Sequence, residues 1–189
     1  MIAQFAMYDW PEERARLDRL WQLLRQALAA EGIAAPPALD RATPLADSWE
    51  SPDLLIGQTC GLPYRTRLHG RVTLLGAFDY ALPGTPAGHY FSVLVVAADS
   101  DAESVADLDR PHLAVNGFDS QSGWAALAND WPDLAFASLL TTGAHLDSAR
   151  AVAEGRADLA ALDAVSWRLL GLHRPALAAR LRVIGRTTP

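Results

Sequence analysis

The second half of the chain alternates short apolar runs with segments of helical periodicity. The apolar runs cover residues 90–98, 113–115, 136–140, 159–162 and 181–184. Helical spacing of apolar positions marks residues 104–108, the segment that begins near Trp124, the segment around 149–153 and residues 165–172. Strands that alternate with helices are typical of a mostly parallel sheet covered on both faces. The pattern therefore predicts an α/β fold.

The first half shows a similar but sparser pattern. Residues 2–8 predict a short buried strand that ends at Tyr8, and apolar residues at 53–57 and 72–78 predict two more strands. A helix is expected from near Pro11, with leucines and a tryptophan at helical spacing, until Gly32 ends it. Residues 82–89 are rich in turn formers, which favours a crossing between two lobes.

Composition narrows the class of protein. The chain has 189 residues, of which 50% are hydrophobic and 20% charged, which suits one or two compact units and argues against disorder. A net charge of −6 disfavours a nucleic-acid surface, so no nucleic-acid partner is expected. No apolar run approaches the length of a membrane span, so no membrane insertion is expected. The N-terminus lacks a secretory signal, which predicts a cytoplasmic protein as written, or a periplasmic one if a signal has been removed.

The most informative segment is the turn between the strand at 113–115 and the helix of Trp124. It carries two hydroxyls and a glycine in the series Ser120, Gln121, Ser122 and Gly123. Unpaired amide groups gather at the start of a helix, where the helix dipole favours an anion such as phosphate, phosphonate, sulfonate or carboxylate. Serine is also a common N-cap residue, so a purely structural cap is the alternative interpretation.

Four segments, taken in order, resemble one known family. They are residues 58–61, residues 90–96, the turn 119–123 with Gly143-Ala-His145, and residues 151–163. This series is similar to the phosphate/phosphite/phosphonate substrate-binding proteins of ABC transporters. The resemblance implies a type II periplasmic-binding-protein fold, in which two lobes of mixed, mostly parallel sheet are flanked by helices.

The resemblance also implies a division of the chain. Residues 1–88 would form the first lobe, residues 89–182 the second lobe, and residues 183–189 the start of a return crossing. Family members use a C-terminal return segment to complete the first lobe. Because the sequence stops where that crossing should begin, we expect the first lobe to be incomplete at its C-terminal side.

The family's ligand contacts can be carried over to matching positions of this chain. The resemblance implies contacts from Ser120, Gln121, Ser122, Gly123, His145 and Asp163 of the second lobe, with Tyr8 and Cys60 facing them from the first lobe. For Asp163 the alternative is a cap of the following helix, and for Cys60 it is a small buried apolar residue. The implied protein binds a small anionic ligand for an ABC permease, needs no cofactor or metal, and is not an enzyme.

Two other functions stay open. Enzymes of the thiaminase and pyrimidine-precursor type share this fold, and one of these could use Cys60 as nucleophile and His145 as base. A ligand-sensing effector domain is the other alternative. Cys60 is the only cysteine, so neither an internal disulfide nor a zinc site made of thiolates is expected.

Overall fold

The computed structural model describes residues 1–189, which separate into two compact units, Met1–Val72 and Thr73–Pro189. We call them unit 1 and unit 2 and describe each by itself. This division by contacts within the chain does not test the expected lobe boundaries, which stay a prediction. No helix in either unit combines the length and the apolar character that crossing a membrane requires.

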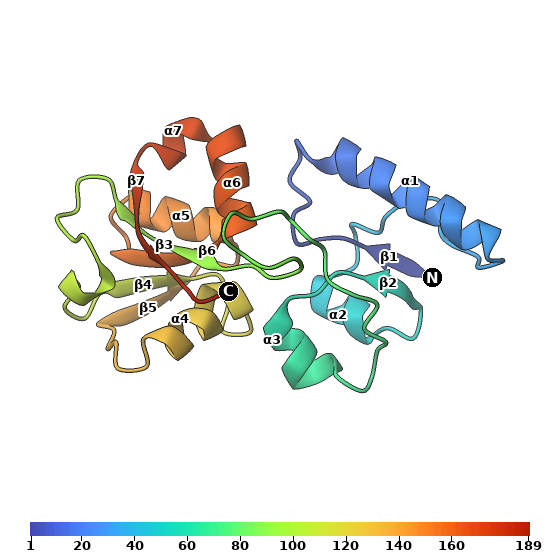
Figure 1. The fold of residues 1–189 in the computed structure, drawn as a ribbon, viewed down its shortest axis with the longest axis horizontal. Coiled ribbons are helices and arrows are strands. Elements are labelled where there is room, and N and C mark those ends of the chain that lie inside the picture. The colour runs from blue at the N-terminus through green and yellow to red at the C-terminus, as the bar shows by residue number, and fades with distance from the viewer. The chain divides into compact units, whose positions relative to one another are not determined.

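Unit 1 is built on two parallel strands, β1 (Ile2–Gln4) and β2 (Leu54–Gly57). Figure 1 shows the long helix α1 (Arg14–Ala30) beside them. Shorter helical segments follow, namely α2 (Leu45–Glu50), α3 (Gly61–Pro63) and the π-helical turn η1 (Tyr64–Leu68).

The core of unit 1 forms where α1 packs on the strands. Trp21 is fully buried, contacts Phe5 edge to face, and donates from its indole nitrogen to the Pro36 carbonyl at 3.1 Å. Leucines at helical spacing on α1 pack around it. Gly32 has a φ of 74°, a left-handed conformation that glycine adopts without steric cost, and it ends the helix as predicted.

Unit 2 contains a five-stranded mixed sheet in the order β5-β4-β6-β3-β7. The strands are β3 (Ser92–Ala97), β4 (His112–Val115), β5 (Ser138–Thr141), β6 (Leu159–Asp163) and β7 (Leu181–Arg186). Strand β4 pairs in parallel with β5 and β6, whereas β3 pairs antiparallel with β6 and β7. Four strands therefore share one direction and β3 alone runs against them, which confirms the mixed, mostly parallel sheet.

Helices cover both faces of this sheet (Figure 1). One face carries α5 (His145–Ala153), α6 (Ala164–His173) and α7 (Pro175–Ala178). The other face carries η3 (Gln121–Ala125) and α4 (Ala126–Asp130), while the short 3-10 turn η2 (Val105–Asp107) precedes β4. The central strands are buried on both sides, and alternate residues such as Leu94, Leu113 and Leu159 pack with Leu127 of α4.

The expected strand at 72–78 was wrong. Val72 forms only an isolated bridge to His69, and residues 73–80 adopt no regular secondary structure. Leu74 and Leu75 are exposed. The apolar pattern is that of a strand, but a strand is stable only when a neighbour accepts its hydrogen bonds, and no strand of the described chain pairs with this segment.

Two boundaries in unit 1 also differ from the prediction. The first strand stops at Gln4, four residues before the predicted end at Tyr8, because its parallel pairing with β2 stops there. Helix α2 was missed. Its N-terminal neighbour is Pro44 and its six residues include Asp47 and Ser48, so it offers no apolar run long enough to show helical periodicity.

Candidate functional site

The turn after β4 is held by hydrogen bonds from its own residues and from β3. Ser120 is the N-cap of η3, and its Oγ accepts from the Gly123 amide at 3.0 Å. The Ser92 hydroxyl on β3 donates to the Ser122 carbonyl at 2.8 Å. Because β4 lies inside the sheet, its carboxyl end delivers this turn to the edge where open α/β sheets bind ligands.

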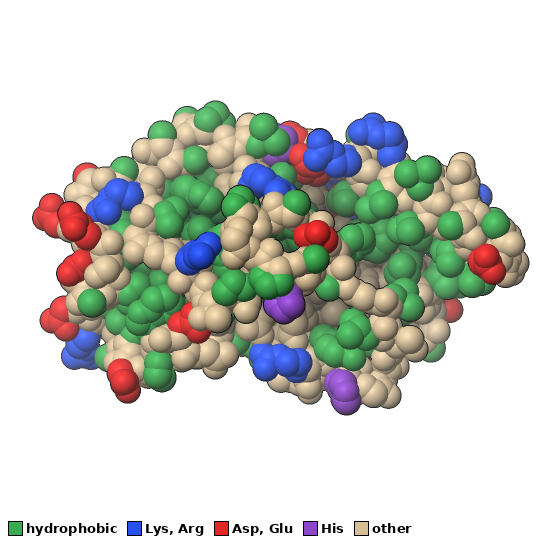
Figure 2. Space-filling model, viewed as in Figure 1, with side chains coloured by type: hydrophobic (Ala, Val, Ile, Leu, Met, Phe, Trp, Pro, Cys, Tyr) green, Lys and Arg blue, Asp and Glu red, His purple; other side chains and the backbone are tan.

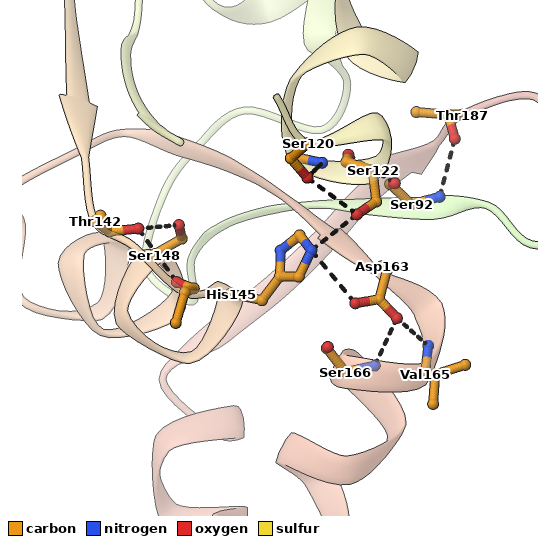
Figure 3. Close-up of polar contacts among 12 residues, drawn as sticks. Ser92, Ser120, Ser122, Thr142, His145, Ser148, Asp163, Val165, Ser166 and Thr187 are labelled. Atoms are coloured by element: carbon orange, nitrogen blue, oxygen red, sulfur yellow. Dashed lines mark hydrogen bonds and ion pairs between the residues drawn. The ribbon is translucent and has the colours of Figure 1, made fainter. Parts of the chain in front are cut away.

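A chain of polar contacts joins this turn to two other strand ends (Figure 3). The Oγ of Ser122 lies 2.8 Å from Nε2 of His145, and the same nitrogen lies 3.3 Å from Oδ2 of Asp163. The His145 and Asp163 side chains are 13% and 4% exposed, so water competes little for these contacts. Three segments distant in sequence therefore present donors and acceptors at one point.

Asp163 has two structural roles besides its contact with His145. It is the N-cap of α6, and its Oδ1 accepts from the amides of Val165 at 3.0 Å and Ser166 at 2.9 Å. The cap interpretation of Asp163 is therefore confirmed, as is the cap interpretation of Ser120. Whether either residue also binds a ligand stays a prediction.

Burial controls the charge of His145. Loss of hydration lowers the pKa of His145 from its ordinary value of 6.5, while the Asp163 carboxylate and the Ala161 carbonyl act in the opposite direction. The neutral imidazole is therefore favoured at neutral pH, and it can offer one N–H donor to a ligand.

This depressed pKa predicts an acid-sensitive stability. The unfolded chain, with an ordinary histidine, binds a proton more readily than the folded chain, so the free energy of unfolding should fall as pH falls through 6.5. Urea unfolding between about pH 7.5 and 5.5 measures this, and a His145→Gln variant should show a shallower decline. If the free energy of unfolding falls equally with pH in both proteins, His145 is not the source of the acid sensitivity.

Close packing, rather than a left-handed backbone conformation, requires a glycine at position 123. A β-carbon at this position would collide with Oδ1 of Asn116 and would lie 3.3 Å from Cε1 of His145. The absence of a side chain lets the turn, the end of β4 and the start of α5 approach one another. Asn116 and Ser92 also belong to this cluster, although neither was among the site residues predicted from the sequence.

The predicted site residues fall into two groups. Ser120, Ser122, Gly123, His145 and Asp163 of unit 2 come together, and Gln121 lies beside them as the half-buried first residue of η3. The other two predicted residues, Tyr8 and Cys60, are half-buried members of unit 1. Their predicted position opposite the first group stays a prediction.

The cluster around Ser122 and His145 contains neither a metal-binding group of side chains nor an arginine side chain. No three His, Cys, Asp or Glu side chains converge so that they could hold a metal ion. The basic side chains in view in Figure 2 are all arginines, and they are scattered rather than gathered in one basic patch. Any anion bound at the turn would therefore rely on local hydrogen-bond donors.

Comparison with known proteins decides the family. The family described as "ABC transporter, phosphonate, periplasmic substrate-binding protein" matches residues 66–189, about two thirds of the chain. The chain belongs to this family of periplasmic phosphonate-binding proteins. Among curated proteins, none matches the chain.

Solved structures similar to this family member come from several organisms. A binding-protein component of an ABC phosphonate transporter from Pseudomonas aeruginosa is 26% identical, with a TM-score of 0.46, over 53% of this chain and 37% of that one. PhnD1 from Prochlorococcus marinus in complex with methylphosphonate is 18% identical, with a TM-score of 0.43, over 52% and 41%. The substrate-binding protein of an amino acid ABC transporter is 14% identical, with a TM-score of 0.47, over 87% and 65%. The matched region thus spans about two fifths of the phosphonate-binding structures' length.

Proposed function

We propose that this family member binds a small oxyanion of the phosphonate, phosphate or phosphite type for ABC-dependent uptake in the periplasm. The observation that carries the proposal is the convergence of Ser120, Ser122 and His145 at the start of η3. These side chains lie at the carboxyl edge of the sheet, where ligands of open α/β folds bind. The helix dipole of η3 and α4 favours a negative charge at the same place.

The recognition would rely on donors that carry no formal charge. The hydroxyl of Ser122 and the imidazole of His145 contact each other at 2.8 Å, and each can turn a hydrogen-bond donor toward an anion instead. Hydrogen bonds to a charged acceptor are about twice as strong as neutral ones. Exchanging the Ser122–His145 contact for two contacts with an anion is therefore favourable, although the chain carries a net charge of −6.

The geometry argues for binding rather than catalysis. In a Ser-His-Asp triad the hydroxyl and the carboxylate contact opposite ring nitrogens, so that Nε2 can take the hydroxyl proton while the carboxylate orients the ring through its Nδ1–H group. Here Ser122 and Asp163 both approach Nε2 of His145. The family to which the chain belongs does not favour the alternative enzyme that pairs Cys60 with His145, nor a sensor domain.

Calorimetry of the whole chain tests this function. Methylphosphonate, inorganic phosphate and phosphite are titrated into the protein, and tryptophan fluorescence is followed in parallel because Trp124 lies in η3. We expect at least one probe to bind, and a Ser122→Ala variant to bind it about 10-fold more weakly, since a hydrogen bond to a charged group contributes about 1.5–3 kcal/mol.

A matched control is a Ser138→Ala variant on β5, where the exposed serine contacts only His112. Its affinity should equal that of the original protein. The proposed function is wrong if none of the three anions gives heat or a fluorescence change with the unmodified protein.

A further inference from the structure

Asn116 stands at the exit of the central parallel strand. It directly follows β4, and its carbonyl accepts from the Gly143 amide at 3.1 Å. Gly143 lies two residues before His145, at the entrance to α5. One residue therefore connects the end of β4 to the loop that carries the histidine of the site.

The side chain of Asn116 is fixed at one end. Its Oδ1 is enclosed and lies so close to Gly123 that a β-carbon there would collide with it. That same β-carbon position is 3.3 Å from Cε1 of His145, so the amide oxygen and the histidine ring both lie close to Gly123. A Cα–H group of glycine is a weak donor to a carbonyl oxygen, which suits this placement of the oxygen.

The other end of the side chain is available. Asn116 as a whole is half-buried, and its amide nitrogen is not among the enclosed polar atoms that lack a partner. No side chain or carbonyl of the protein accepts a hydrogen bond from this nitrogen. With the oxygen held against Gly123, the amide group presents its two N–H donors on the opposite side.

We propose that Asn116 is a further ligand-contacting residue of this site, and that its amide nitrogen donates to the bound oxyanion. This inference rests on the proposed function. A tetrahedral anion offers more acceptor positions than Ser122 and His145 can occupy, and no Lys or Arg side chain contacts either of them. The side-chain amide of Asn116 supplies a further neutral donor in addition to the backbone amides at the start of the helix.

An Asn116→Asp variant tests the inference, because aspartate has nearly the same shape but replaces the donor with an anionic oxygen. Titration with methylphosphonate at neutral pH, where aspartate is ionised, should show affinity reduced about 100-fold. The matched control is Asn129→Asp, which adds the same charge at an exposed position of α4 and should bind as the unmodified protein does.

A second measurement needs no variant. In the unmodified protein, the side-chain amide signals of Asn116 should shift when methylphosphonate is added, whereas those of Asn129 should not. If the unmodified protein binds methylphosphonate but the Asn116 amide does not shift and Asn116→Asp binds equally well, this inference is overturned and the proposed function stands. If the unmodified protein binds neither methylphosphonate, phosphate nor phosphite, the proposed function itself fails.

Discussion

A Gly123→Ala variant is expected to bind methylphosphonate about 100-fold more weakly than the unmodified protein, or not at all. The added methyl group would collide with Oδ1 of Asn116, would lie 2.9 Å from its Cγ and would press on the ring of His145. Overpacking of this kind typically costs about 1–3 kcal/mol. Relief requires Asn116 or His145 to leave the cluster, so the loss of affinity follows directly from the loss of geometry. Calorimetry measures the affinity and thermal unfolding measures the stability.

Gly171 provides the control for this substitution. It lies in α6 with no atom within 4 Å of the position of an added β-carbon. Alanine is favoured over glycine inside a helix by about 1 kcal/mol, so Gly171→Ala should raise stability slightly and leave binding unchanged. Equal affinity of the Gly123→Ala and Gly171→Ala variants would show that close approach at Gly123 is not needed for binding.

The second large effect is expected for Asp163→Ala. This substitution removes the acceptor for two amides at the start of α6 and the carboxylate beside His145, all in a nearly dry environment. Loss of an N-cap costs about 1 kcal/mol, and each buried donor left without an acceptor costs about 1–3 kcal/mol. We expect the free energy of unfolding to fall by about 2–4 kcal/mol in urea titrations.

Two comparison variants show which role of Asp163 matters. Asp163→Asn keeps an oxygen for the cap and should lose less stability than alanine does. Asp107→Ala removes an exposed cap, in which the carboxylate accepts from Ser104, and should cost about 0.5–1 kcal/mol. If Asp163→Ala lowers the free energy of unfolding by no more than Asp107→Ala does, burial of Asp163 does not add to the stability that its cap provides.

Much of unit 2 could be predicted from the sequence because its signals are local. Buried parallel strands appear as short apolar runs, and the helices between them show a period near 3.6 residues. Ser120 lies in the turn that follows β4 and Asp163 is the last residue of β6, and each caps the next helix, so a capping residue near a strand end marks the start of a helix at the edge of the sheet. Five of the site residues that the family resemblance implied lie in one cluster.

The remaining features depend on contacts that sequence spacing does not encode. Ser92 reaches the Ser122 carbonyl, and Asn116 reaches Gly123, only because the sheet order brings β3, β4 and α5 to one edge. The apolar segment 72–78 has the composition of a strand, but composition cannot tell whether a partner strand exists. Conversely, a short helix such as α2 contains too few residues to show a period.

The antiparallel position of β3 has a consequence for biosynthesis. This strand is the first of its sheet to leave the ribosome, yet both of its neighbours, β6 and β7, come much later in the chain. Until Arg186 has been translated, the apolar residues of Ser92–Ala97 lack one of their final neighbours. Nascent chains with such unpaired apolar strands are targets for chaperones and prone to association, so this sheet can be completed only after β7 has been synthesised.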